Sequence, residues 1–306
     1  MAKIWYSGLD NYKKHIMEDN TFIMEIANGP INKFKTVQDA FAASLSDLRN
    51  PVEVLYSGGL DSECILVACL EKNIPVIAVT MRLLFNGRPF NTHDLYYAEK
   101  FCRNNNIRQV FFDLDIDDFF GNGDHIPYTE PYKITLPHVA THMWLIDKCH
   151  TFPIVGGDYC WPQTNIEKNV YSPSRHEFAC YDAFMQDRGI SGIGNMLSHS
   201  LDANIFFIKE HIKVCANDPV NTGGDDLRIG TLKLKVLENL GFGKLEPRHK
   251  SYGWEAIDNR QKWFDRSRLS LSLRGRYGPV KSIIKWGDAL GSILGVGAGE
   301  NSSYGK

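Results

Sequence analysis

The residues of this chain best suited to chemistry stand in one short string, Ser57-Gly58-Gly59-Leu60-Asp61-Ser62. Its two glycines allow positive φ angles and a close approach of a ligand to the backbone. The hydroxyls of Ser57 and Ser62 add donors, and the amides at a helix N-terminus attract anions. Asp61 would repel a phosphate unless a cation such as Mg²⁺ lay between them. The string therefore predicts a phosphate-binding turn with a metal ion, although it lacks the lysine of the usual P-loop.

The residues on either side of this string predict the elements that position it. An apolar run, Val52 to Tyr56, predicts a buried strand before it, and helical spacing predicts a helix from Ser62 to Glu71 after it. A strand, a tight turn and a helix N-terminus form an anion-binding geometry. A plain strand-to-helix turn is the alternative for the glycine pair alone. The similar string Tyr6 to Asn11 lacks one glycine and the closing serine, so we interpret it as a coincidence.

The wider pattern predicts an α/β fold, a doubly wound parallel sheet with a mostly helical C-terminal region. Apolar runs predict further strands at 75–80, 109–114 and 152–155. Helical spacing predicts helices at 33–48, 93–104, 137–149, 227–240, 254–264 and 281–294, while 121–137 and the glycine-rich end from 295 onward predict irregular chain. We expect an N-terminal extension with a lead-in helix (1–50), an α/β domain that carries the phosphate-binding turn (51–215) and a helical C-terminal region with a flexible tail (216–306).

A second glycine string, Gly156-Gly157-Asp158, follows the strand predicted at 152–155. In a parallel sheet it would stand beside the first string. Its glycines could then approach the pyrophosphate of a nucleotide, and Asp158 could share the metal with Asp61. A glycine turn with a helix-capping aspartate is the alternative.

A basic stretch from Glu246 to Gly253 is the third candidate. A phosphate group that leaves a reaction builds up negative charge, which fixed cations stabilise. Arg248 and Lys250 are the cations of this stretch best suited to that role. A solvated basic loop is the alternative.

Four further groups could do chemistry, but a structural interpretation is favoured for each. We interpret Asp113, Asp115, Asp117 and Asp118 as an acidic surface rather than a metal site, and the pair His138 and His142 has no evident third metal ligand. We interpret the series Arg266, Arg268, Arg274 and Arg276 as a salt-bridged surface rather than an RNA contact, and Cys160 as a core thiol rather than a nucleophile.

The composition is that of a globular protein, with 43% apolar and 23% charged residues in a chain of 306. The formal net charge of −2 argues against a broad electrostatic grip on nucleic acid. The seven cysteines form no C-x-x-C pair, which predicts reduced thiols. No apolar run approaches the ~20 residues that span a bilayer, and the N-terminus lacks a signal-peptide pattern. We therefore expect a cytoplasmic protein without a membrane partner.

The string at 57–62 resembles the PP-loop of the N-type ATP pyrophosphatases, a superfamily that cleaves ATP between the α and β phosphates. Within that superfamily the chain looks most like the synthetase domain of asparagine synthetases. The entry Arg49-Asn50-Pro51-Val52 supports this likeness, and Gly156 to Asp158 resembles a shortened form of that family's second glycine element. The stretch from Leu232 to Lys250 resembles its late basic segment. The likeness covers about residues 35 to 255.

The resemblance implies a fold of the adenine nucleotide alpha hydrolase type and a set of roles for an ATP site with Mg²⁺. The nucleotide would be bound by Ser57, Gly58, Gly59, Leu60, Asp61, Ser62, Val79, Thr80, Met81, Gly156, Gly157 and Arg248, with Val79 to Met81 near adenine. The metal would be held by Asp61 and Asp158, and the catalytic residues would be Asp61, Asp158 and Lys250.

The implied activity is that of an AMP-forming ligase, in which an acceptor oxygen is adenylated, pyrophosphate leaves and an amine displaces AMP. The glutaminase domain of asparagine synthetases has no counterpart here, since residue 2 is Ala and ~35 residues precede the likeness. We therefore expect a small-molecule acceptor with free ammonia, an amine or a separate ammonia-supplying partner. A PP-loop enzyme that modifies a base in tRNA or DNA is one alternative, and a non-catalytic nucleotide-binding protein is another.

Overall fold

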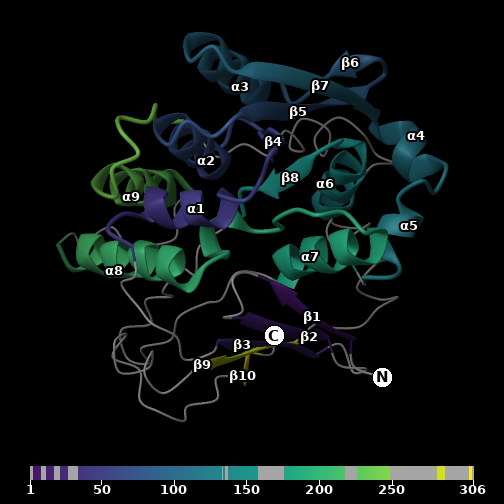
Figure 1. Ribbon diagram of the computed structural model, residues 1–306. Coiled ribbons are helices and arrows are strands. Elements are labelled where there is room, and N and C mark those ends of the chain that lie inside the picture. Colours follow the sequence, from purple (N-terminus) through teal and green to yellow (C-terminus); the bar gives the residue numbers. More distant parts are fainter. Residues whose placement is uncertain are drawn as a thin grey trace.

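The computed structural model describes residues 3–7, 12–16, 21–26, 34–132, 134, 137–157, 176–217, 226–248, 281–286 and 303–304. Its central element is a parallel sheet of four strands in the order β7-β5-β4-β8 (Figure 1). The strands are β4 (Val52–Leu55), β5 (Val76–Phe85), β7 (Arg108–Asp115) and β8 (Phe152–Val155), and the short β6 (Arg88–Pro89) pairs antiparallel with the end of β5. After β4 the chain adds β5 and β7 on one side of it and then returns to add β8 on its other side, so the loops after β4 and β8 meet at the switch point.

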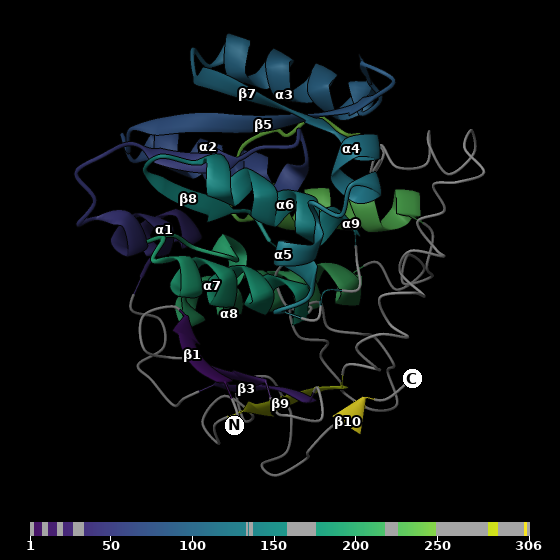
Figure 2. The ribbon, with the colours of Figure 1, turned by 90° about the vertical axis from the view of Figure 1, so that its right-hand side faces the viewer.

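Helices cover both faces of this sheet, which confirms the doubly wound α/β fold. They are α1 (Val37–Leu45), α2 (Leu60–Glu71), α3 (Thr92–Asn104), α4 (Ile116–Gly121), α5 (Ile126–Thr129), α6 (Pro137–Lys148), α7 (His176–Arg188), α8 (Leu201–Asn217) and α9 (Asp226–Asn239), with a 3-10 turn at Met196–Ser198. Figure 2 shows the same layers from the side.

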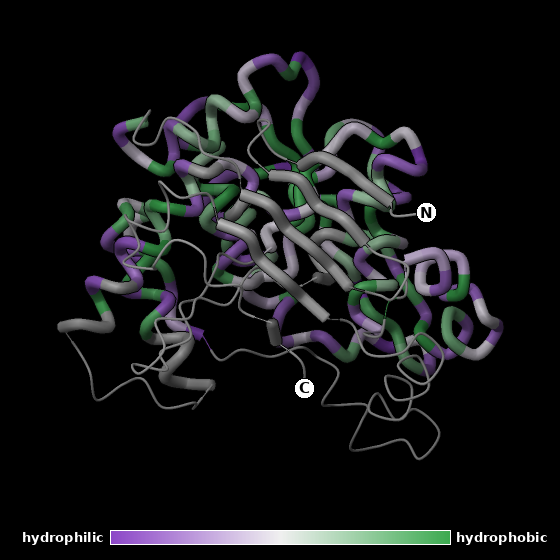
Figure 3. The backbone as a smooth tube through the Cα atoms, turned by 90° about the horizontal axis from the view of Figure 1, so that it is seen from below, coloured by the Kyte–Doolittle hydropathy of each residue, from purple (hydrophilic) through white to green (hydrophobic). Residues whose placement is uncertain are grey.

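Alternation along the strands divides the core into two clusters, one on each face. Leu55, Val79 and Val155 belong to the cluster that α6 and α7 cover. Their neighbours Val54, Ala78 and Ile154 belong to the cluster that α1, α2, α3, α8 and α9 cover. Successive side chains of a strand point to opposite faces, so each strand supplies both cores. In Figure 3 hydrophobic and hydrophilic stretches alternate along the helices, as expected where one side of each helix is buried.

A buried acid fixes β8 beside β4. Glu53 lies inside β4 with 6% of its surface exposed. Its carboxylate accepts hydrogen bonds from the backbone amides of His150 and Thr151, each at 2.7 Å, just before β8 begins. Because buried polar groups must be satisfied, these bonds hold the start of β8 next to β4.

The two ends of the chain contribute strands to a second sheet, in the order β1-β2-β3-β9-β10. Strands β1 (Lys3–Ser7), β2 (Tyr12–Ile16) and β3 (Thr21–Ile26) are antiparallel neighbours, β3 runs parallel to β9 (Lys281–Trp286), and β9 pairs antiparallel with β10 (Ser303–Tyr304). The prediction of a helix at 281–294 is therefore wrong. The adjacent pair Ile283-Ile284 fits a strand as well as a helix, and β-branched residues favour strands.

Other differences from the expected elements are smaller. The irregular stretch at 121–137 contains α5, and α7 and α8 occupy a region for which no helix was predicted. Strand β5 is longer than expected and continues to Phe85. The glycine-rich end from 295 includes β10, and the predicted helix at 254–264 lies outside the described residues. Among the helices in the described part of the chain, none combines the length and apolar character that a membrane crossing requires.

Candidate functional site

The turn between β4 and α2 has the conformation that its glycines predict. Gly58 has φ +86°, in the left-handed region that favours glycine. A Cβ atom at Gly58 would lie 2.3 Å from the carbonyl oxygen of Asp94, so α3 packs directly against the turn. Gly59 is the N-cap of α2, and no side chain caps this helix start. The first amides of α2 therefore have no capping side chain and are suited to an anion.

The second glycine string lies against the first. Strand β8 is the parallel neighbour of β4, with Leu55 opposite Val155. A Cβ atom at Gly156 would lie 3.0 Å from the backbone nitrogen of Ser62, and one at Gly157, where φ is +75°, would lie 2.0 Å from Oδ1 of Asn195. The Gly156 contact joins the second loop to the first at the switch point, and only glycine fits at Gly157 against Asn195.

Asp61 forms an ion pair with Lys233 of α9. Nζ of Lys233 lies 2.6 Å from Oδ2 and 2.5 Å from Oδ1 of Asp61. The Lys233 side chain is 12% exposed and the Asp61 side chain 29% exposed. A lysine and an aspartate thus lie together beside the uncapped start of α2, in a partly buried position where charge interactions are stronger than in water.

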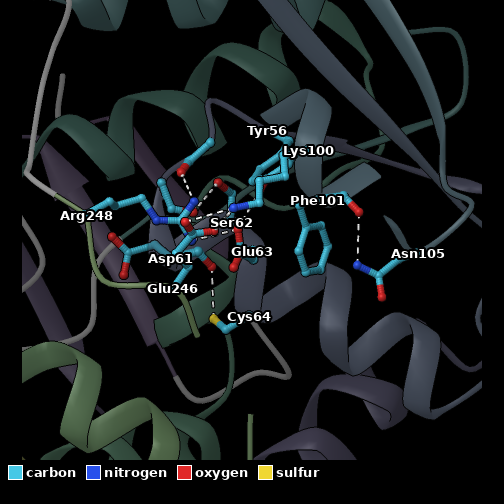
Figure 4. Close-up of polar contacts among 12 residues, drawn as sticks. Tyr56, Asp61, Ser62, Glu63, Cys64, Lys100, Phe101, Asn105, Glu246 and Arg248 are labelled. Atoms are coloured by element: carbon cyan, nitrogen blue, oxygen red, sulfur yellow. Dashed lines mark hydrogen bonds and ion pairs between the residues drawn. The ribbon is translucent and has the colours of Figure 1, made fainter. Parts of the chain in front are cut away.

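A buried network lies behind the turn (Figure 4). Glu63, in the first turn of α2, accepts a hydrogen bond from the hydroxyl of Tyr56 at 2.5 Å and pairs with Nη2 of Arg248 at 2.7 Å. Nη1 of Arg248 donates to the carbonyl oxygen of Gly58 at 2.6 Å. Burial and the neighbouring Glu63 raise the pKa of Tyr56 far above its usual value, so its hydroxyl remains a donor.

The residues expected near adenine lie at the level of the turn but are mostly covered. Val79 is opposite Leu55, and the amide of Tyr56 donates to the carbonyl of Val79 at 2.8 Å. The hydroxyl of Thr80 donates to the carbonyl of Tyr56 at 2.9 Å. Thr80 and Met81 are 1% and 9% exposed. The predicted strand ended at residue 80, which would have placed these residues at its end. Because β5 continues to Phe85, they lie within the strand instead.

The structure brings together most, but not all, of the predicted site. Ser57 is exposed at the turn, and Ser62 is buried with its hydroxyl donating to the carbonyl of Gly59 at 3.3 Å. Asp158 and Lys250 lie outside the described residues, as do Cys160 and the arginine series at 266–276. Their roles stay predictions.

The other candidate groups have structural partners. Asp115 is the N-cap of α4 and accepts from the amides of Asp117 and Asp118. Nδ1 of His142 lies 2.7 Å from the hydroxyl of Tyr181. Within the described ranges no group of three or more potential metal ligands occurs. Five cysteines are free thiols, namely Cys64, Cys69, Cys102, Cys149 and Cys180. Burial raises the pKa of Cys69 to about 12.

Sequence reasoning missed two members of this site as functional residues, Lys233 and Glu63. Lys233 precedes the buried Val236 and Leu237 by three and four positions, so it occupies the buried face of α9. A lysine on an otherwise apolar face was the available signal. Glu63 follows the glycine string directly, but its partner Arg248 could not be inferred from spacing.

Comparison with known proteins gives a fold-level likeness only. No family model and no curated protein matches the chain. Solved structures that resemble it include a predicted subunit of tRNA methyltransferase from Methanocaldococcus jannaschii (17% identity, 52% of this chain and 74% of that chain, TM-score 0.30), the NMN synthetase from Francisella tularensis (11%, 71% and 98%, 0.31) and the U34-tRNA thiolase NcsA from Methanococcus maripaludis (14%, 79% and 77%, 0.30). At these TM-scores the function must be argued from the site itself.

Proposed function

We propose that this protein is an ATP-dependent, AMP-forming enzyme of the ATP pyrophosphatase type. The observation that carries the proposal is the Ser57–Ser62 turn at the switch point, with Asp61 and Lys233 beside the uncapped start of α2. Amides, hydroxyls and a lysine suit the phosphates of a nucleotide. An aspartate among them suits a bridging cation.

The residues present fit Mg-ATP. Gly58 and Gly156 let the two loops pack closely, since a Cβ atom at either position would meet the backbone of Asp94 or Ser62, and α2 begins with its first amides at this turn. Asp61 offers carboxylate oxygens of the kind Mg²⁺ prefers, and Asp158 would be the second ligand. When bound, Mg²⁺ would offset the charge that builds on the departing pyrophosphate. Lys233 would hold a phosphate oxygen from the α9 side.

We propose a reaction in two steps. An acceptor oxygen attacks the α-phosphorus of ATP, the bond to the β-phosphate breaks and pyrophosphate leaves. Ammonia or another amine then displaces AMP from the adenylated acceptor. The turn would hold the phosphates in line with the acceptor, while Lys233 and Lys250 would stabilise the leaving group. The acceptor would be a small molecule, with the amine free or supplied by a partner protein.

Product analysis with α-labelled ATP and Mg²⁺ tests this proposal. The wild type and Asp61→Asn would be compared with ammonium and a panel of carboxylates, and separately with total tRNA. Asp113→Asn is the matched control, because Asp113 is an exposed aspartate that pairs with Arg82. We expect AMP and pyrophosphate from the wild type and from Asp113→Asn, and a loss of about 100-fold or more in Asp61→Asn.

Each outcome has a distinct meaning. Stimulation by carboxylates and ammonium would support the ligase, while stimulation by tRNA alone would move the assignment to a base-modifying PP-loop enzyme. Release of ADP, or ATP binding without turnover under every condition, would contradict α–β cleavage and favour a nucleotide-binding protein without catalysis.

A further inference from the structure

The segment that follows α9 is anchored beside the nucleotide turn. Phe242 and Leu245 are buried, with 2% and 3% of their surfaces exposed, and both belong to the core cluster that includes Tyr56. Glu246 pairs with Lys100 of α3 at 2.8 Å. The two buried side chains hold the segment in place, while the exposed Glu246–Lys100 pair adds little to this anchoring. Arg248 thereby reaches the turn, although it lies 190 residues from Gly58 in the sequence.

The guanidinium group of Arg248 interacts with three other residues of the protein. Nη1 donates to the carbonyl oxygen of Gly58 at 2.6 Å, and Nη2 lies 2.7 Å from Oε2 of Glu63. The face of the guanidinium lies over the ring of Tyr97, with 4.8 Å between its carbon and the ring centroid. This arrangement combines a charge-assisted hydrogen bond, an ion pair and a cation–π contact.

The same geometry leaves little of Arg248 for a phosphate. Its side chain is 6% exposed, and that of Glu63 is 4% exposed. Nε of Arg248 is also enclosed by protein and reaches no hydrogen-bond partner among the described residues. The adjacent carboxylate of Glu63 offsets the positive charge, so a phosphate at the turn would feel less of it.

We propose that Arg248 is a positioning residue, which fixes the turn through Glu63 and the carbonyl of Gly58 instead of binding phosphate itself. Tyr56 completes this set, since its hydroxyl donates to the same oxygen of Glu63. The residue before the turn, the carbonyl inside it and the residue after it are thereby tied to one buried group. We call Tyr56, Glu63 and Arg248 the turn latch. The consequence for nucleotide binding rests on the proposed function.

The latch reduces the ordering that a ligand must otherwise impose. Gly58 and Gly59 give the turn many accessible backbone conformations. When only a fraction of molecules holds the binding conformation, the apparent affinity falls by that fraction. Loss of the latch should therefore weaken the binding of every ligand that uses the turn, even though the latch side chains are not themselves proposed to bind that ligand.

Two measurements on Glu63→Gln, Arg248→Gln and the double variant test this proposal. The first is amide hydrogen exchange of residues 57–62 in the ligand-free protein. We expect each single variant to raise exchange there by about 10-fold or more, with the double variant close to the singles. Lys100→Ala is the control, because it removes the exposed ion pair between α3 and Glu246, which lies two residues before Arg248. It should change exchange at residues 57–62 by less than about 3-fold. Unchanged exchange in the latch variants would overturn the proposal.

The second measurement is the dissociation constant of Mg-ATP for the same variants. A latch predicts that the two substitutions are not additive, since each breaks the same device. Multiplying losses would instead show that Arg248 binds phosphate independently of Glu63, and would overturn the proposal. Absence of Mg-ATP binding in the wild type would contradict the proposed function alone, because the exchange experiment still tests the latch.

A milder variant guards against misfolding. Tyr56→Phe keeps the buried ring and removes only the hydroxyl that donates to Glu63. If the Glu63 and Arg248 variants fail to fold, as buried pairs can when one partner is lost, Tyr56→Phe should still raise exchange at 57–62 without unfolding the protein. No change in that variant would contradict the latch.

Discussion

Asp61 puts a negative charge beside the start of α2, and Lys233 offsets it there. Nζ of Lys233 is within 2.6 Å of both carboxylate oxygens. In the proposed function, Lys233 would bind a phosphate oxygen while the carboxylate of Asp61 would bind the cation. The pair thus keeps the site balanced in charge without ligand, and supplies both signs of charge when one binds.

Replacing Lys233 should weaken Mg-ATP binding. We expect Lys233→Gln to raise the dissociation constant by about 10-fold, because a cation is lost and Asp61 is left without its offset. The free energy of unfolding should fall by about 1–2 kcal/mol, as for the loss of a partly buried charged bond. Lys235→Gln is the matched control, since Lys235 lies exposed two positions further along α9. Equal losses in calorimetric titrations of both variants would contradict the role given to Lys233.

His142 should make stability depend on pH. Burial lowers the pKa of His142 to about 4, from 6.5 in the unfolded chain. Between these values the unfolded state binds a proton that the folded state does not, so stability falls as the pH drops from 6.5 to 4, by at most about 3 kcal/mol. Below pH 4 this contribution causes no further loss.

Urea denaturation at several pH values measures this effect. His142→Gln should flatten the dependence between pH 6.5 and 4. A slope in His142→Gln as steep as that of the wild type would show that another group causes it.

At this scale the sequence revealed the residues of the turn but not their partners. The glycine and hydroxyl types in one string were sufficient to predict the turn, because its chemistry is local. Lys233 is 172 residues from Asp61, and no short-range spacing encodes that contact. The pairing of Arg248 with Glu63 is equally long-range. Arg248 was expected to bind phosphate, and its burial was not visible in the sequence.

At the scale of helices and strands, α3 packs so closely against the turn that no side chain fits at Gly58. Gly58→Ala would strain a left-handed residue and place Cβ 2.3 Å from the backbone of Asp94. We expect a loss of about 3 kcal/mol in unfolding free energy and no measurable Mg-ATP binding. Gly87→Ala is the control, because its φ of +69° is similarly strained but nothing lies within 4 Å of the added Cβ.

Gly87→Ala should lower the unfolding free energy by only about 1 kcal/mol. The difference between the two variants then gives the contribution of the α3 contact. Thermal unfolding with and without Mg-ATP compares the two variants. Equal losses in both would mean that α3 does not restrain the turn.

Elements with strong patterns were predicted better than those defined by remote pairing. The strand β4, the turn and α2 follow from an apolar run, two glycines and helical spacing. Strand β9 was mistaken for a helix because its backbone partner is β3, some 260 residues earlier, and its side-chain pattern is too short to decide. The expectation that the strand at 152–155 lies beside the first strand in a parallel sheet was also correct, since parallel strands with helical crossovers permit few arrangements.

The whole molecule depends on a core that joins distant parts of the chain. Phe242 stacks on Phe207 of α8, with 6.2 Å between ring centroids, and lies 6.3 Å from Phe41 of α1. Phe242→Ala should lower the unfolding free energy by about 3–5 kcal/mol, because it opens a cavity among three aromatic rings. Tyr96→Ala, at a ring that is 57% exposed, should change it by less than about 0.5 kcal/mol. Chemical denaturation of both variants measures the difference, and a small loss in Phe242→Ala would contradict this account of the core.

Because Arg248 contacts the turn from a distant part of the sequence, the turn is synthesised before the residue that fixes it. A ribosome adds about 5–20 residues per second, and folding of the emerging chain begins from its N-terminal side. The 190 residues between Gly58 and Arg248 then correspond to about 10–40 s of synthesis. During that interval the strand, the turn and α2 are already made, but the groups that fix them are still missing. A nascent chain of this protein therefore carries the Ser57–Ser62 turn well before it can hold the turn in its final shape.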